Sequence, residues 1–261
     1  MWYADGDALP PLVSLGILLG MRRAEMSEAL RTATRRQIRN DRILTPVEDN
    51  QEIWAAGVTY LSSRDERQAE SVAADVYGKV YEADRPEIFF KSPGRRAVGD
   101  GGKIRIRRDS DWNVPEPELT LVVNRYGEIV GYTAGNDVSS RSIEGENPLY
   151  LPQAKTYDGS CAVGPAIVLA GADELTDLPI RCTIRRDGSE VFAGDARTSQ
   201  MKRRFLELVE YLMRETSFPD GVFLMTGTGI VPSQGFTLMP GDVVTVKVGE
   251  LTLVNEVDQN R

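Results

Sequence analysis

The sequence predicts an α+β fold that is rich in strands and begins with a small N-terminal α/β domain, residues 1–46. Two observations support this. Helical patterns lie near the start of the 261-residue chain, and short apolar segments separated by turn residues dominate from residue 86 onward. Because the chain lacks the regular strand–helix alternation of a parallel α/β fold, residues 47–261 are assigned to one strand-rich second domain.

Two helices and a buried strand are expected in the first third of the chain. Residues 9–21 are apolar and predict a strand or a buried segment that leads into a helix. Residues 24–39 are rich in Ala, Glu and Arg, which favours a helix. After a linker at residues 46–51, residues 53–60 predict a buried strand and residues 63–81 a second helix.

Strands are expected in most of the remaining chain. Residues 103–107 alternate strictly between polar and apolar, as in a half-buried strand. Residues 119–123 and 129–133 predict a strand pair, joined by a turn that contains Gly127. Further strands are expected at residues 88–90, 167–170, 180–185 and 243–248. Residues 201–214 predict an amphipathic helix, with apolar residues at helical spacing at Phe205, Leu206, Val209 and Leu212.

Charge and composition narrow the class of partner. The formal net charge is −8, which repels phosphate backbones, so nucleic acid is not an expected partner. Apolar runs fall short of the roughly 18–20 residues that a membrane span needs, so no membrane partner is expected either. The two cysteines, Cys161 and Cys182, have no metal-binding or disulfide spacing, which fits a reducing cytoplasm.

The chain contains no histidine. This excludes a Ser-His-Asp triad, a Cys-His pair and any metal site built on imidazole. Acid–base chemistry must therefore come from carboxylates, lysine, tyrosine or water. A metal site must be built from oxygen ligands, which suit magnesium, or manganese or calcium, better than zinc or copper.

The segment Pro115-Glu116-Pro117-Glu118 is the most unusual in the chain. Each proline biases the residue before it toward extended backbone and removes a donor from the sheet, which indicates a segment at the edge or rim of a sheet. In extended chain, side chains two residues apart point the same way, so Glu116 and Glu118 should project from one face.

A third acidic residue can be placed by the register of a hairpin. If the following turn is a two-residue loop centred between Tyr126 and Gly127, residue 116 lies opposite Asp137. A slip of one residue would send Asp137 to the other face. On spacing alone, both a magnesium site of Glu116, Glu118 and Asp137 and an ordinary solvated edge remain open.

The ordered set of motifs over roughly residues 50–250 resembles the fumarylacetoacetate hydrolase family. Two further segments, residues 85–91 and 144–153, resemble the branch of that family that contains 2-keto-3-deoxy-D-arabinonate dehydratase. The motifs that carry the family resemblance are Glu116-Pro117-Glu118, Gly135-Asn136-Asp137-Val138-Ser139-Ser140-Arg141, Lys155, Gly164-Pro165 and Thr226-Gly227-Thr228.

This resemblance implies a mixed β-sandwich roll with a small N-terminal domain, a bound magnesium ion and a homodimer or higher homo-oligomer. It implies that Glu116, Glu118 and Asp137 are the metal ligands. It places Lys155 near the substrate carboxylate or leaving oxygen, and Thr228 with Gly227 in a loop that binds the carboxylate.

The resemblance also implies roles for three further residues. Glu87 and Glu144 are acid–base candidates, for which structural salt bridges are the alternative. Phe89 is a candidate for substrate contact. Because successive residues of a strand point to opposite faces, at least one of Phe89 and Phe90 is expected in the core.

The activity implied is the dehydration of a 2-keto-3-deoxy sugar acid, such as a 2-keto-3-deoxypentonate, by a metal-dependent lyase. The C3 proton is removed to give an enolate, and the C4 hydroxyl then leaves. Hydrolysis of a carbon–carbon bond in a 2,4-dioxo acid is the main alternative, although members that do this commonly use a histidine–glutamate pair. Decarboxylation or tautomerisation of a 2-oxo acid, and a non-catalytic metal-dependent protein that binds small acids, also remain open.

Overall fold

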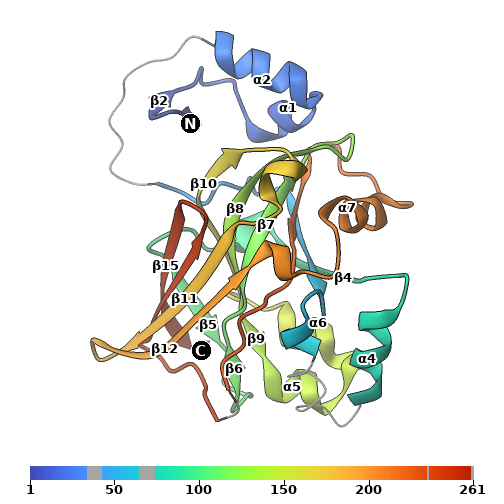
Figure 1. The fold of residues 1–261 in the computed structure, drawn as a ribbon. Coiled ribbons are helices and arrows are strands. Elements are labelled where there is room, and N and C mark those ends of the chain that lie inside the picture. Colours follow the sequence, from blue (N-terminus) through green and yellow to red (C-terminus); the bar gives the residue numbers. More distant parts are fainter. Residues whose placement is uncertain (34–42, 65–73, 234, 260–261) are drawn as a thin grey trace.

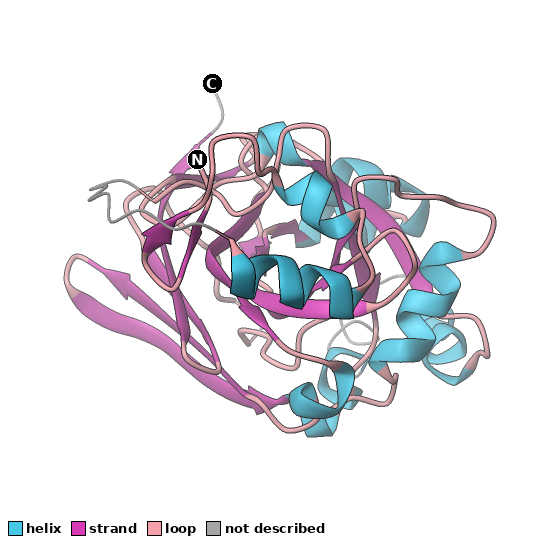
Figure 2. Ribbon diagram, turned by 90° about the horizontal axis from the view of Figure 1, so that it is seen from above, coloured by secondary structure: helices cyan, strands magenta, loops and turns pink. Residues whose placement is uncertain are grey.

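Two β-sheets packed face to face form the body of the structure (Figure 1). The computed structural model describes residues 1–33, 43–64, 74–233 and 235–259. In the view from above, helices lie around the outside of the strands (Figure 2). The predicted strand-rich α+β fold with mixed sheets is therefore confirmed.

The larger sheet has six strands in the order β10-β8-β7-β13-β3-β4. Strands β3 and β13 run parallel, and the other neighbours are antiparallel. Every residue of β7 and β8 is buried, so these strands are covered on both faces. The strands are β3 (Glu52–Gly57), β4 (Glu87–Pro93), β7 (Pro117–Val123), β8 (Ile129–Asp137), β10 (Cys161–Leu169) and β13 (Val222–Met225).

The second sheet has five strands in the order β12-β11-β14-β15-β5, with β5 parallel to β15. Ile104 and Ile106 are buried in β5 while Lys103 and Arg105 are exposed, which confirms the predicted half-buried strand. One face of this sheet packs on the larger sheet and encloses the main apolar core. The strands are β5 (Lys103–Ile106), β11 (Pro179–Arg186), β12 (Ser189–Arg197), β14 (Val243–Val248) and β15 (Leu251–Gln259).

Short N-terminal elements cover part of the other face of the six-stranded sheet (Figure 1). Leu18, Leu19 and Met26 share an apolar cluster with Val122 and Phe223 of that sheet. The prediction of a buried segment leading into a helix is confirmed in part for residues 9–21, because Leu9 and the three leucines of α1 are buried whereas Leu12 and Ile17 are exposed. The elements are β1 (Tyr3–Ala4), β2 (Asp7–Ala8), α1 (Leu15–Leu19) and α2 (Arg23–Thr32).

Two predicted helices extend into residues that the structure does not describe. The helix expected at residues 24–39 is present as α2, and residues 34–39 lie outside the described residues. The helix expected at residues 63–81 is present at its end as α4 (Ala74–Glu82), and residues 65–73 lie outside them. The domain division after residue 46 stays a prediction.

The predicted amphipathic helix is α7 (Phe205–Met213), which begins four residues later than expected. Leu208 is buried on its inner face, whereas Leu206, expected on that face, is 61% exposed. The chain just before α7 instead contacts the end of α4, where the Arg203 guanidinium donates to the carbonyl oxygens of Val80, Ala83 and Asp84. Within the described residues, no helix is long and apolar enough to cross a membrane.

Several short elements that the sequence pattern did not predict lie beneath the six-stranded sheet in Figure 1. Most of them connect β8 to β10, and they carry functional side chains. They are β6 (Asn113–Val114), β9 (Ser139–Ser140), α5 (Arg141–Glu146), the 3₁₀ turn η2 (Pro148–Tyr150) and α6 (Leu151–Lys155). Three more 3₁₀ turns lie elsewhere, at Gly94–Arg96, Ala172–Leu175 and Thr198–Gln200.

Candidate metal centre and substrate site

The β7–β8 hairpin has the register that the sequence predicts, but a different turn produces it. Glu118 pairs with Gly135, and the Asp137 amide donates to the Glu116 carbonyl at 2.9 Å. The predicted two-residue loop is wrong, because residues 124–128 form a five-residue loop. A bulge that adds Val130 to β8 compensates for the longer loop, so Asp137 still faces Glu116.

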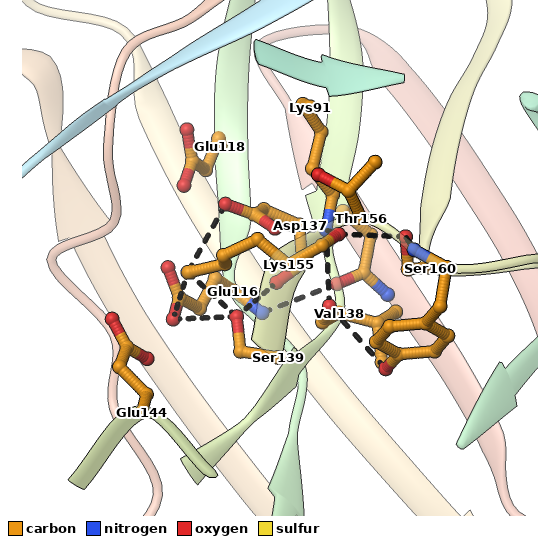
Figure 3. Close-up of polar contacts among 12 residues, drawn as sticks. Lys91, Glu116, Glu118, Asp137, Val138, Ser139, Glu144, Lys155, Thr156 and Ser160 are labelled. Carbon is orange, nitrogen blue, oxygen red and sulfur yellow. Dashed lines mark hydrogen bonds and ion pairs between the residues drawn. The ribbon is translucent and has the colours of Figure 1, made fainter. Parts of the chain in front are cut away.

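Three carboxylates meet at this end of the hairpin (Figure 3). Glu116, Glu118 and Asp137 each offer one oxygen, and these oxygens lie within 4.8 Å of one another. The three residues are 4%, 1% and 1% exposed, which excludes the solvated edge as an interpretation.

Lys155, the last residue of α6, reaches this cluster (Figure 3). Its ammonium donates to Glu116 Oε1 at 2.8 Å, to Asp137 Oδ2 at 3.1 Å and to Ser139 Oγ at 2.6 Å. The Lys155 side chain is buried and does not lie on the protein surface. One cation thus contacts two of the three carboxylates directly.

Lys91 is a second buried lysine at the cluster, and the sequence pattern gives it no role. Its Nζ lies 2.5 Å from Asp137 Oδ1 and donates to the Val138 carbonyl at 3.1 Å. It is the extra residue of a bulge in β4, between the pairs Ile53–Ser92 and Trp54–Phe90. The sequence contains one indication of this role, a lysine within an otherwise apolar strand. The bulge that directs the lysine inward cannot be predicted from the alternation of polar and apolar residues.

Replacing Lys91 with Met is expected to destabilise the metal-free protein by about 3 kcal/mol, because a buried charge of Asp137 loses a partner. Urea unfolding with and without magnesium would measure this, and magnesium should restore most of the loss. The control is Lys103→Met, which removes an exposed pair with Glu256 and should cost less than about 1 kcal/mol. Equal effects of the two variants would contradict a charge-balancing role for Lys91.

Arg141 and Glu144 extend the cluster toward α5. A nitrogen of the Arg141 guanidinium lies 3.2 Å from Glu116 Oε1, and another lies 3.9 Å from Glu144 Oε2. Both side chains are buried. Glu144 therefore reaches the carboxylates through Arg141, and it lies beside them in the close-up (Figure 3).

A backbone amide group, and not a cationic side chain, orients the Glu118 carboxylate. Its Oε2 accepts a hydrogen bond from the Gly227 amide at 2.6 Å. Burial raises the pKa of Glu118 well above its usual range, and the charges of Asp137 and Glu116 raise it further, against the lowering effects of Lys155 and the Gly227 amide. The structure thus brings the Gly227–Thr228 loop to the cluster, although the Thr228 hydroxyl itself binds within its own turn, to the Ile230 amide at 3.1 Å.

Two glycines lie close to the end of β3. A Cβ atom on Gly227 would lie 3.0 Å from the Ala56 carbonyl oxygen, and the next residue, Gly57, pairs with Glu87 on β4. A Cβ atom on Gly57 would lie 2.0 Å from Glu87 Oε2, so the Glu87 carboxylate lies directly over this glycine. Glu87 therefore reaches across β3 toward the metal cluster.

Phe89 and Phe90 point to opposite faces of β4, as expected. The Phe89 ring centroid is 5.6 Å from Lys155 Nζ, and its ring also packs on the apolar cluster of the N-terminal helices. Phe90 packs edge-on against Trp54, with ring centroids 5.8 Å apart. Phe89 is the one that lies on the face of the candidate site.

The motif resemblance implies an acid–base role for Glu87. On that basis the Gly57→Ala substitution is expected to lower kcat/KM about 100-fold, because the added methyl group displaces the Glu87 carboxylate. Gly57 does not use a positive φ, so the backbone accepts alanine. Steady-state kinetics on purified, folded protein would test this, with Glu87→Gln expected to show a loss of the same order. Normal turnover in Gly57→Ala would show that the position of the Glu87 carboxylate over Gly57 is unimportant.

The cluster has the properties of a divalent-cation site. All three side chains are carboxylates, the ligands that magnesium prefers in proteins. An ion about 2.1 Å from each ligand would separate the ligand oxygens by about 3–4 Å, so only small movements are needed. Burial and then repulsion from Asp137 and Glu116 raise the pKa of Glu118, and a cation would relieve the repulsion.

Comparison with known proteins defines the class. Residues 52–258 match the family model described as "Fumarylacetoacetate (FAA) hydrolase C-terminal". The chain therefore belongs to the fumarylacetoacetate hydrolase family, and the resemblance of its motifs is confirmed.

Two relatives and one solved structure are similar to this chain over most of its length. The chain is 51% identical over 219 residues to a probable 2-keto-3-deoxyxylonate dehydratase of Haloferax volcanii, covering 83% of this chain and 75% of that protein. It is 43% identical over 233 residues to a 2-dehydro-3-deoxy-D-arabinonate dehydratase of Saccharolobus solfataricus, and the match covers 86% of this chain and 77% of that protein. The fold is similar to the solved structure of a 2-keto-3-deoxy-D-arabinonate dehydratase complexed with magnesium and 2,5-dioxopentanoate. The TM-score is 0.83 and the sequence identity 36%, and the match covers 98% of this chain and 95% of that chain.

Proposed function

We propose that this chain is a magnesium-dependent hydro-lyase that dehydrates a 2-keto-3-deoxy sugar acid such as a 2-keto-3-deoxypentonate. The buried cluster of Glu116, Glu118 and Asp137, with Lys155 in hydrogen-bond contact, is the observation that carries this proposal. The names of the two relatives, and the magnesium and 2,5-dioxopentanoate in the similar structure, support the substrate class.

The charges in the cluster favour an ion together with an anionic substrate. Four buried carboxylates, including Glu144, face three buried cations: Lys91, Arg141 and Lys155. These groups together carry one net negative charge. A divalent cation and a singly charged 2-oxo acid carry one net positive charge between them. The ion, the acid and these buried groups would then be neutral in sum, which lowers the cost of their burial.

A bound magnesium ion would supply a Lewis acid that favours enolate formation from the 2-oxo acid. In our proposal the chain itself moves the protons. Glu87, over Gly57, accepts the proton from C3, and Lys155 or Glu144 protonates the C4 hydroxyl, which leaves as water. The unsaturated product then becomes a 2,5-dioxo acid when one proton moves from C5 to C3 and a second moves from the C5 hydroxyl group to C4, with no oxidant required.

The remaining features of the proposal concern ligands and assembly. Gly227 and Thr228 are proposed to receive the substrate carboxylate, and Phe89 to line the site. Manganese or calcium would be alternative ions. The two free, buried cysteines fit a cytoplasmic protein, and a homodimer or higher homo-oligomer is proposed from the family resemblance. Light scattering of the purified protein would test the last point.

The direct test is to incubate the protein with 2-keto-3-deoxypentonates and magnesium and to follow 2,5-dioxopentanoate by NMR. Turnover should be lost with a chelator and return with magnesium. Cleavage of acylpyruvates, or decarboxylation or tautomerisation of oxaloacetate, with no dehydration would replace this proposal by another reaction. Metal-dependent binding of 2-oxo acids without any turnover would indicate a binding protein.

A further inference from the structure

Tyr60 lies beside the candidate site, just beyond the end of β3. Val58 has a φ of +52°, which is rare for a β-branched residue, and this conformation turns the chain away from the strand direction. Thr59 then donates to the Thr226 carbonyl at 2.7 Å. The Tyr60 ring lies against Gly229, where a Cβ atom would be 2.7 Å from Tyr60 Cδ1. The loop of residues 226–229 is therefore packed directly on this tyrosine.

The hydroxyl group of Tyr60 is buried without a hydrogen-bond partner among the residues that the structure describes. The residue is only 2% exposed. Burial raises the pKa of the phenol, and the nearby charge of Glu118 raises it further, so the group stays protonated and can donate. Because buried polar groups in native proteins are nearly always paired, this donor indicates a missing acceptor.

We propose that the Tyr60 hydroxyl is a substrate contact that donates a hydrogen bond to the carboxylate end of the bound 2-oxo acid. The identity of the acid rests on the proposed function. Three observations carry the inference: the unpartnered buried donor, its packing on the Gly227–Thr228–Gly229 loop, and its position near Glu118. An anionic acceptor in this position would both pair the phenol and lie next to the ion held by Glu118.

The test is the Tyr60→Phe substitution, which removes only the oxygen. Binding of 2-oxopentanoate, a 2-oxo acid without hydroxyl groups, is measured by calorimetry in the presence of magnesium, and its dissociation constant is expected to rise about 10- to 100-fold. Magnesium affinity without the acid should not change. The melting temperature of the unliganded variant should equal or exceed that of the wild type, because no internal hydrogen bond is lost.

Tyr132→Phe is the matched control. Tyr132 is also buried, but its hydroxyl group is hydrogen-bonded to the Glu250 backbone, away from the site. Its loss should lower the melting temperature by about 2–4 °C and leave 2-oxopentanoate affinity unchanged. A similar fall in melting temperature for Tyr60→Phe would show that its hydroxyl group has a protein partner, and would overturn the proposal.

Binding measurements with two different 2-oxo acids also distinguish this proposal from the proposed dehydratase activity. An equal loss of affinity for 2-oxopentanoate and a 2-keto-3-deoxypentonate is expected for a contact at the shared carboxylate end. A loss confined to the hydroxylated acid, or a change below twofold for both, would overturn the assignment of Tyr60. Wild-type protein that binds 2-oxopentanoate but dehydrates no sugar acid would refute the dehydratase alone. Wild-type protein that binds no 2-oxo acid with magnesium would refute both.

Discussion

The Glu118→Gln variant is expected to lose magnesium-dependent turnover, with kcat/KM at least about 1,000-fold lower, and yet to be more stable than the wild type when no metal is present. Glutamine keeps the shape of the side chain and its contact with the Gly227 amide, but it gives up the charge that would hold a cation.

The gain in stability follows from the environment of Glu118. The folded state raises the pKa of this carboxyl group by burial and by repulsion from Asp137 and Glu116. Between its unfolded and folded pKa values, the native state binds more protons than the unfolded state, so the stability of the metal-free wild type should fall as pH rises through this window. Glutamine removes this contribution, and the variant should show a flatter dependence on pH above about 4.3.

Thermal unfolding and isothermal titration with magnesium would test both parts of this prediction. The metal-free variant should melt at least about 2 °C higher than the wild type at pH 7 and show no increase on addition of magnesium. Glu256→Gln, at an exposed position on β15, is the matched control and should leave magnesium binding intact. A Glu118→Gln protein that binds magnesium with wild-type affinity would remove Glu118 from the ligand set.

The carboxylate cluster can be predicted because its two determinants are local. The alternation of an extended strand places Glu116 and Glu118 on one face, and hairpin register places Asp137 opposite Glu116. The predicted turn is wrong while the predicted register is right, because a bulge compensates for the longer loop. The prediction thus depends on a compensation that the sequence pattern does not reveal.

Lys91 and Tyr60 cannot be predicted in the same way. A bulge directs Lys91 toward Asp137, and a positive φ at Val58 precedes the turn that brings Tyr60 against the Gly227–Thr228 loop. Both features are departures from regular strand geometry, whereas periodicity describes only regular strands. Lys155 is identified by resemblance alone, because nothing in its local pattern indicates that α6 ends beneath the carboxylates.

The Lys155→Met variant is expected to lose turnover and bind magnesium more tightly. The Lys155 ammonium contacts Glu116 Oε1 and Asp137 Oδ2, two residues that would hold the ion, so it repels a cation at the same place. At an effective dielectric constant of about 20, a unit charge and a divalent ion about 5 Å apart repel by several kcal/mol. Magnesium affinity should therefore rise at least about tenfold.

Turnover should fall about 100- to 10,000-fold, since the variant lacks a proton donor at the leaving hydroxyl. The metal-free variant should also be less stable by about 3–5 kcal/mol, because two buried carboxylates lose a shared partner, and magnesium should reverse most of this loss. Lys103→Met, which removes an exposed lysine, is the matched control for both measurements.

Magnesium titration and single-turnover kinetics separate the two roles of Lys155. If Lys155 only balanced charge, magnesium would replace it and turnover of the loaded variant would approach that of the wild type. If it also supplies a proton, saturating magnesium restores stability while turnover stays low. Weaker magnesium binding in Lys155→Met would contradict the repulsion argument, because it would mean that the ammonium group positions the ligands more than it opposes the ion.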